Sequence, residues 1–147
     1  MKNKSYFSLN KNLHPLISID RWLNPYKIIN TCDLDGHDIK IALTRRAQQA
    51  LAQLSQALLV EMQLYFSCMV KKRIIFHTGT GVMAFTPVNK HLSIAFRCVQ
   101  SDSCDPLEFA MHFPGKRTLD SASALKMRPR ALHIDYKNSQ WLGDFSI

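Results

Sequence analysis

The sequence has no long apolar run. A secretory signal needs roughly 7–15 continuous apolar residues, and a membrane-spanning helix needs roughly 20. Polar residues interrupt every apolar step of the N-terminal stretch 1–16, and no stretch near 20 apolar residues occurs anywhere in the chain. We therefore expect a soluble cytoplasmic protein with no membrane partner.

Closely spaced cysteines are also missing. The four cysteines lack the short regular spacing of a disulfide framework or a structural zinc site. Cys32, Cys68 and Cys98 lie in apolar or alternating segments, where a free thiol acts as a small hydrophobic group. Cys98, Cys104 and His112 form the one cysteine–histidine cluster, and its spacing is wide for structural zinc. We expect no metal and no cofactor.

Internal repeats and low-complexity tracts are absent as well, and the 147 residues match the length of one domain. Residues 1–26 contain two prolines and several asparagines, which predicts an N-terminal arm packed on the body. Residues 27–147 then form a single domain. Within the arm, the segment "LISIDRWL" (16–23) predicts one short element with Trp22 as its anchor.

Acidic residues are scarce relative to basic ones, and the net charge is +8. Residues 44–74 carry five basic and one acidic side chain, and residues 116–137 carry six basic and two acidic ones. Such blocks suit phosphates, nucleic acid or an acidic protein surface, although they also occur on ordinary solvated surfaces. The predicted binding residues are Arg45, Arg46, Lys71, Lys72, Arg73, Lys116, Arg117, Lys126, Arg128 and Arg130.

The pair Asp35-Gly36 favours a type I′ turn and predicts a hairpin over residues 26–43. Its register places Ile28 opposite Leu43, Cys32 opposite Ile39 and Leu34 opposite His37. Thr44 is a plausible N-cap for a helix over residues 44–59, whose apolar residues recur at spacings of three and four. Residues 60–68 alternate with a period of two and favour a strand. The alternative extends the helix to Met69, because no Gly or Pro separates the two segments.

The middle of the chain predicts two strands, at about 72–86 and 91–99, with "PVNK" (87–90) as the turn between them. Residues 107–115 suggest another strand, and residues 116–129 a basic connection. Hairpin, helix and successive strands predict an α+β fold. We expect a mainly antiparallel curved β-sheet of about six to eight strands, with one principal helix (44–59) packed on one face.

The closing segment 130–145 predicts a second hairpin with its turn at Asn138-Ser139. The register pairs Tyr136 with Trp141, Ile134 with Gly143 and Leu132 with Phe145, which puts the large aromatics on one face. The polar face carries His133 opposite Asp144, together with Asp135. A half-buried sheet explains this pattern without an active site. A histidine–carboxylate pair can also orient a base, so His133, Asp135 and Asp144 are the catalytic candidates.

The glycine-containing segment "HTGTG" (77–81) lacks the Gly-Lys-Ser/Thr of a P-loop and the third glycine of a dinucleotide fingerprint. It predicts a bulge within a strand. Because bare backbone can approach a ligand closely, Gly79, Thr80 and Gly81 form the candidate phosphate loop.

The sequence therefore favours a basic, non-enzymatic binding or regulatory module that contacts nucleic acid or an acidic partner. It shows no RNP-type, helix-turn-helix or zinc-finger signature. The first alternative is a small α+β enzyme, or an acyl- or nucleotide-binding protein, with a site near His133 and Asp144 or the 77–81 loop. The second alternative is a self-assembling subunit that forms a homo-oligomer through an exposed sheet edge.

Overall fold

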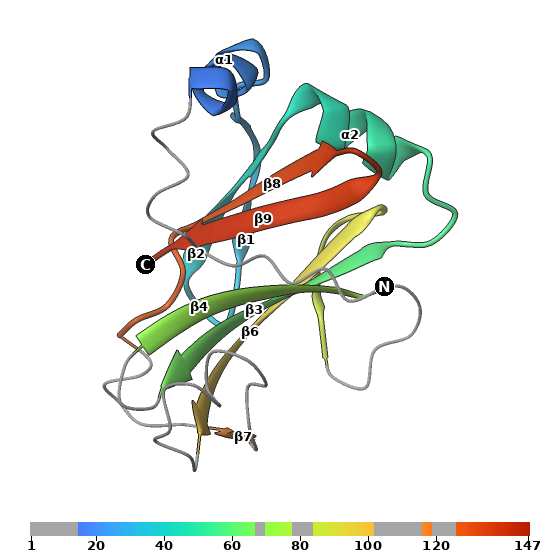
Figure 1. Cartoon of the computed structure of the whole chain (residues 1–147). Coiled ribbons are helices and arrows are strands. Elements are labelled where there is room, and N and C mark those ends of the chain that lie inside the picture. The colour runs from blue at the N-terminus through green and yellow to red at the C-terminus, as the bar shows by residue number, and fades with distance from the viewer. Residues whose placement is uncertain (1–14, 67–69, 78–83, 102–115, 119–125) are drawn as a thin grey trace.

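The structure is a computed structural model, which describes residues 15–66, 70–77, 84–101, 116–118 and 126–147 (Figure 1). The described residues form two helices and nine strands. In chain order these are α1 (Pro15–Leu23), β1 (Lys27–Asp33), β2 (Asp38–Leu43), α2 (Arg45–Ala52), β3 (Leu58–Phe66), β4 (Val70–His77), β5 (Thr86–Asn89), β6 (Leu92–Ser101), β7 (Lys116–Thr118), β8 (Ala131–Lys137) and β9 (Gln140–Ser146).

The strands form two sheets rather than the single curved sheet that we expected. Sheet A has the strand order β1-β2-β8-β9, and sheet B has the order β4-β3-β6-β5 with the short β7 beside β6. Each sheet contains one parallel pair, β2 with β8 and β3 with β6, among antiparallel ones. The prediction of one sheet was wrong because strands β3 to β7 pair among themselves, whereas β8 pairs with β2 and so belongs to the other sheet. The coarser α+β class holds, with strands predominating.

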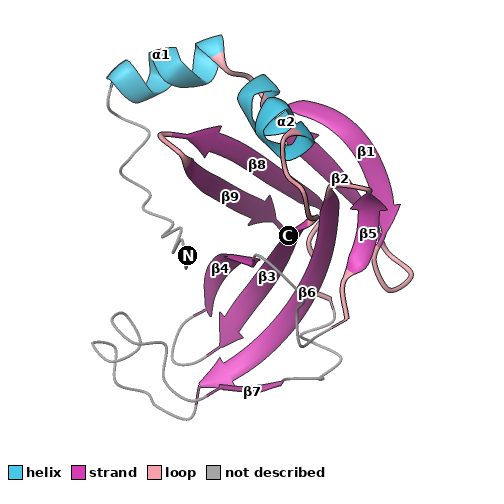
Figure 2. Cartoon of the chain, turned by 90° about the vertical axis from the view of Figure 1, so that its right-hand side faces the viewer, coloured by secondary structure: helices cyan, strands magenta, loops and turns pink. Residues whose placement is uncertain are grey.

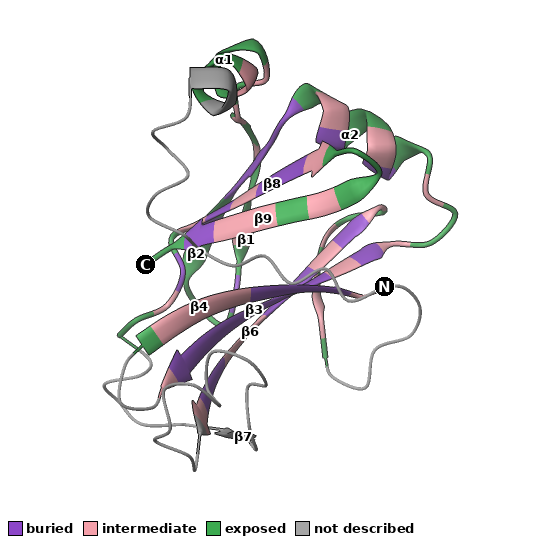
Figure 3. Ribbon diagram, in the orientation of Figure 1, coloured by how far each residue is buried: buried purple, intermediate pink, exposed green. Residues whose placement is uncertain are grey.

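The two sheets enclose one hydrophobic core, visible as buried segments on strands of both sheets (Figure 3). Inward-facing residues include Ile41 of β2, Met62 of β3 and Ile134 of β8, all with 0% exposure. The edges of the sheets also meet. Lys72 Nζ of β4 donates to the carbonyl oxygen of Phe145 in β9 at 2.6 Å. On the other side, Asn30 Nδ2 of β1 donates to the carbonyl oxygen of Val88 in β5 at 3.1 Å.

Helix α2 begins at the predicted cap, but it is shorter than we expected. Thr44 Oγ1 accepts a hydrogen bond from the Ala47 backbone N at 3.2 Å. The helix ends at Ala52 rather than at residue 59, because Leu58 already joins sheet B through a hydrogen bond to the His91 carbonyl oxygen. Ala47 and Leu51 are buried in the core, so α2 closes one end of the two-sheet sandwich instead of covering a face (Figure 2).

The preferred prediction of a strand over residues 60–68 is confirmed as far as Phe66, where the described residues pause, and β3 begins two residues earlier, at Leu58. The predicted turn over "PVNK" was wrong. Residues 86–89 pair with β6 as β5, and the chain turns at Lys90 and His91. The Asn89 Oδ1 stabilises this later turn by accepting from the His91 backbone N at 2.8 Å. The segments 78–81 and 107–115 lie outside the described residues, and residues 116–118 form β7.

Both predicted hairpins are present. In β8–β9, the structure confirms all the predicted pairs, including His133 opposite Asp144. In β1–β2, Cys32 pairs with Ile39 as predicted. Ile28 lies opposite Ala42 rather than Leu43, because the register shifts between Ile28 and Asn30. The φ angles of +54° at Asp35 and +80° at Gly36 fit the predicted type I′ turn.

The short element in the N-terminal arm is helix α1, but Trp22 does not anchor it. The Trp22 side chain is 80% exposed, and its neighbours Ile19 and Leu23 are also exposed. The polar side of the helix, with Asp20 and Arg21, contacts the body instead. Neither of the two described helices is long and apolar enough to cross a membrane.

Candidate functional site

Two basic segments that are far apart in the sequence lie side by side around the end of β9 (Figure 1). Lys72 Nζ donates to the Phe145 carbonyl oxygen, and the Arg130 backbone N donates to the carbonyl oxygen of the next residue, Ser146, at 2.7 Å. The Lys40 backbone N donates in turn to the Arg130 carbonyl oxygen at 2.9 Å. We call the resulting group the basic corner. It consists of Lys40, Lys72 and Arg130, whereas Lys71 and Arg73 lie on the other face of sheet B from Lys72.

The basic corner combines exposed cations with partly buried ones. Lys40 and Arg130 are exposed, whereas Lys72 on the edge strand β4 is partly buried. The bond to the Phe145 carbonyl oxygen and the ion pair with Asp144 hold the Lys72 ammonium group in place. The exposed side chains keep the freedom to adjust to a partner, which suits contacts with phosphate groups.

Acidic residues limit the basic corner on two sides. Asp144 Oδ1 forms an ion pair with Lys72 Nζ, at a distance of 3.1 Å. At the turn end of the first hairpin, Asp33 and Asp38 lie opposite each other, and Asp38 shares a face with Lys40. The exposed cations of the corner, Lys40 and Arg130, therefore lie together near the start of β8.

The other predicted basic residues lie away from this corner or are only partly defined. Lys126 is exposed, and Arg128 Nη1 donates to the Asp35 carbonyl oxygen at 3.0 Å, at the hairpin turn. Lys116 and Arg117 lie in β7 beside β6. The candidate phosphate loop, Gly79, Thr80 and Gly81, lies outside the described residues, as do Cys68, Cys104 and His112. Cys32 and Cys98 are free thiols.

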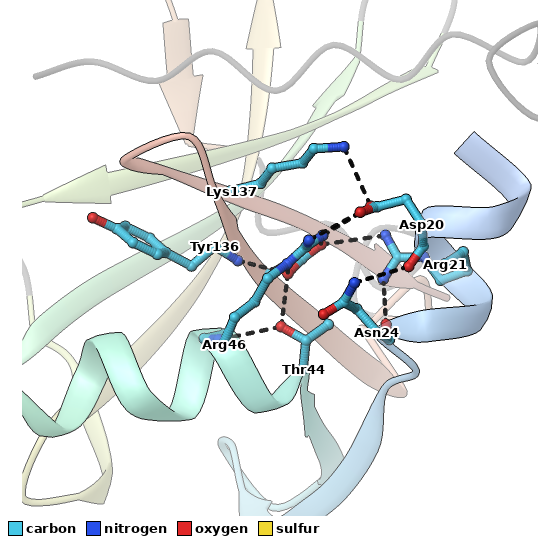
Figure 4. Close-up of polar contacts among 9 residues, drawn as sticks. Asp20, Arg21, Asn24, Thr44, Arg46, Tyr136 and Lys137 are labelled. Carbon is cyan, nitrogen blue, oxygen red and sulfur yellow. Dashed lines mark hydrogen bonds and ion pairs between the residues drawn. The ribbon is translucent and has the colours of Figure 1, made fainter. Parts of the chain in front are cut away.

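The Arg46 side chain, in contrast, is bound to carboxylates within the protein (Figure 4). Its guanidinium donates to both oxygens of Asp135, from Nε at 2.7 Å and from Nη2 at 2.6 Å. The same guanidinium donates to both oxygens of Asp20, at 3.0 and 2.9 Å. Lys137 Nζ lies 3.4 Å from Asp20 Oδ2. Arg46 therefore joins α1 to sheet A, and its neighbour Arg45 is the exposed member of the pair.

Asp135 is the buried centre of this network rather than part of a solvated face. Its side chain is 1% exposed, and Thr44 Oγ1 donates to its Oδ1 at 2.6 Å. Burial raises the pKa of Asp135, but hydrogen bonds from Arg46, Thr44 and the Tyr136 backbone outweigh burial and hold it below its usual range. The expectation that Asp135 lies on a solvated polar face was wrong, because α1 and the start of α2 cover this part of sheet A.

The other catalytic candidates have separate partners. His133 lies edge-on against the Tyr26 ring, with ring centroids 5.0 Å apart. Burial lowers the pKa of His133, and the nearby charge of Asp144 only partly opposes this effect. Asp144 is held by Lys72, and Asp135 is held by Arg46. The structure therefore gives His133 an aromatic environment, with no carboxylate hydrogen-bonded to it among the described residues.

A second polar cluster, on sheet B, was missed by the sequence reasoning. Glu61 is buried, and its carboxylate accepts from Gln63 Nε2 at 2.6 Å, from Arg97 Nη2 at 2.8 Å and from His77 Nε2 at 2.8 Å. Burial raises the pKa of Glu61, but these partners together lower it below its ordinary value. Within the described part of the chain, Gln63 Oε1 and Arg97 Nε are buried without a hydrogen-bond partner.

The Glu61 carboxylate orients the half-exposed His77 and holds Arg97. Such an arrangement can bind a polar group or transfer a proton. The alternation of β3 places Glu61 and Gln63 on one face, which is the signal that the sequence contained. Their partners on β4 and β6 follow only from the strand order, which the sequence does not reveal. Comparison of the chain with protein-family models, with curated proteins and with solved structures finds no match.

Proposed function

We propose that this protein is a basic, non-enzymatic binding module of the cytoplasm, whose basic corner contacts the phosphates of nucleic acid. One observation carries the proposal: two basic segments that are far apart in the sequence, around residues 72 and 130, meet at adjacent residues of β9, Phe145 and Ser146. This convergence produces a concentrated charge that the sequence contains only as separate blocks.

The geometry favours contacts with a backbone rather than with base edges. The exposed cations come from a strand and from a connection, Lys40 from within β2 and Arg130 from the residue before β8. The aromatic residues that could stack on bases near β4 are unsuited to that task, since Phe76 is buried and Tyr65 has 0% exposure. Phosphate contacts without base contacts give binding that depends on salt and tolerates many sequences.

The experiment is fluorescence anisotropy of labelled single-stranded and double-stranded DNA and RNA, titrated with the purified protein at several salt concentrations. We expect micromolar binding near physiological salt, with log K falling linearly on log salt. The slope counts the phosphate contacts at about 0.7–0.9 each. About two contacts are expected, because Lys40 and Arg130 are the exposed cations of the corner, whereas Lys72 is already bonded to Phe145 and Asp144.

A titration with an acidic peptide of matched charge density separates the two partner classes. Tight, salt-dependent binding of the nucleic acids and weaker binding of the peptide support the proposal. Binding of the peptide alone would indicate that the basic corner contacts an acidic protein instead of nucleic acid. Absence of nucleic-acid binding even at low salt would overturn the proposal.

A further inference from the structure

A cleft of about 290 Å³ lies between α2, β1 and the turn that joins β5 to β6. Its floor is apolar and includes Ile29 of β1, Leu43 of β2 and Leu51 of α2. Leu43 and Leu51 belong to the core, with 1% and 3% exposure, so the floor of the cleft is the outer edge of the hydrophobic core. Figure 2 shows β5 beside β1, with α2 above them.

The rim of the cleft is polar and carries positive charge. Gln48 of α2 contributes an amide, and Asn89, Lys90 and His91 border the opposite side. Lys90 is exposed, and none of the described residues that line the cleft is acidic. An apolar floor beside a single exposed lysine is the pattern of a site for an amphipathic anion.

The walls of the cleft are held by bonds that do not depend on a ligand. The Leu58 backbone N donates to the His91 carbonyl oxygen at 2.8 Å, which fixes the turn beside Lys90. The bond from Asn30 to the Val88 carbonyl oxygen ties β1 to β5 below it. A preformed site loses little conformational entropy when a ligand binds, so even a small apolar contact area gives measurable affinity.

We propose that this cleft binds a small amphipathic carboxylate, with its apolar body on Ile29, Leu43 and Leu51 and its carboxylate beside the Lys90 ammonium group. The volume lies just below the usual range of ligand pockets, roughly 300–1,000 Å³, and therefore suits a small molecule rather than a segment of another protein. The charge of Lys90 selects an acid over a neutral amphiphile. The site is separate from the basic corner and from its proposed nucleic-acid contacts.

The first test is displacement of a fluorescent aromatic anion, anilinonaphthalene sulfonate, from the intact protein. Decanoate, naphthoate and the uncharged decanol serve as competitors. We expect decanoate or naphthoate to displace the probe at about tenfold lower concentration than decanol, because the acid gains a charge-assisted contact with Lys90. The stronger of the two acids shows whether the preferred body is aliphatic or aromatic. Equal displacement by decanol and both acids would overturn the proposal, as would the absence of saturable binding.

Variants locate the binding. Lys90→Gln should weaken acid binding about tenfold and leave decanol binding unchanged, whereas the matched variant Lys126→Gln, an exposed lysine away from the cleft, should leave both unchanged. Ala52→Trp and Gln48→Trp each place a large side chain at the cleft from an exposed position of α2. Both should abolish binding, with circular dichroism confirming that each variant folds.

The exposed apolar side of α1 provides the necessary control, because the probe also binds exposed aromatic surfaces. Trp22→Ala removes the most exposed large apolar residue of the described chain. Displacement by decanoate should be the same in this variant as in the wild type. The proposal is wrong if Trp22→Ala abolishes the displaceable signal, or if the folded cleft-filling variants bind decanoate like the wild type.

Discussion

The two ends of sheet A use arginine in opposite ways. At the end near α2, Arg46 donates to two carboxylates at 2.6–3.0 Å and is 23% exposed. At the end near the start of β8, Arg130 uses its backbone to join the sheet and leaves its side chain exposed. Both residues belong to basic blocks in the sequence. The difference teaches that an arginine is available for binding only when the fold does not already supply its partner.

The largest expected effect comes from removing the Arg46 guanidinium. Arg46→Met leaves Asp135 buried without its main counter-charge, so the free energy of unfolding should fall by about 3 kcal/mol. Urea denaturation of the variant and of Arg45→Met measures the effect. The exposed Arg45 should contribute less than about 0.5 kcal/mol. Similar losses for the two variants would remove the distinction between a structural and an exposed arginine.

Acid should weaken the same network. The hydrogen bonds from Arg46 lower the pKa of Asp20 to about 2 against a partial opposing effect of burial. A carboxylate with a lowered pKa stabilises the fold fully above the unfolded pKa of about 3.9, and this stabilisation disappears as the pH falls toward 2. The loss should amount to up to about 2 kcal/mol between pH 5 and pH 2. Urea titrations across this range should show a shallower decline for Arg46→Met than for the wild type.

The cap of α2 should have a smaller effect. Thr44→Ala removes the hydroxyl that accepts from the Ala47 backbone N and donates to Asp135. The expected loss is about 1–2 kcal/mol, from the lost cap and the lost bond to a buried carboxylate. Thermal unfolding compared with Thr31→Ala, an exposed threonine in β1, measures it. A loss equal to that of Thr31→Ala would contradict the assigned role of Thr44.

The smallest effect on stability is expected at the basic corner. Lys40→Gln and Arg130→Gln change exposed side chains, so each should alter the free energy of unfolding by less than about 0.5 kcal/mol. Urea denaturation of the two variants tests this expectation. Losses near those of Arg46→Met would show that the corner, too, is structural.

Local features of the fold could be predicted from the sequence, and long-range ones could not. The turn at Asp35-Gly36, the cap at Thr44 and the register of β8–β9 depend on neighbouring residues, and they were predicted. The division into two sheets depends on the parallel pairing of β2 with β8, between segments far apart in the sequence. The bulge after Ile28 and the early end of α2 depend on such tertiary contacts too.

The candidate sites follow the same division. The basic blocks were visible as composition, but their convergence at β9 required the path of the chain through both sheets. The Asp135 network joins Asp20, Arg46 and Asp135, and no spacing in the sequence indicates it. Trp22 was expected to be buried because tryptophan usually is, whereas the helix is attached through its charged side.

The most direct test of the account compares two double variants of equal net charge. Lys40→Gln/Arg130→Gln removes two cations from the basic corner, and Lys27→Gln/Arg45→Gln removes two exposed cations near the other end of sheet A. Anisotropy with labelled single-stranded RNA across a salt series measures both. The account predicts that the first variant loses about two phosphate contacts from the salt slope, and that the second binds like the wild type. Equal weakening of both would contradict it, because binding would then follow net charge rather than the basic corner.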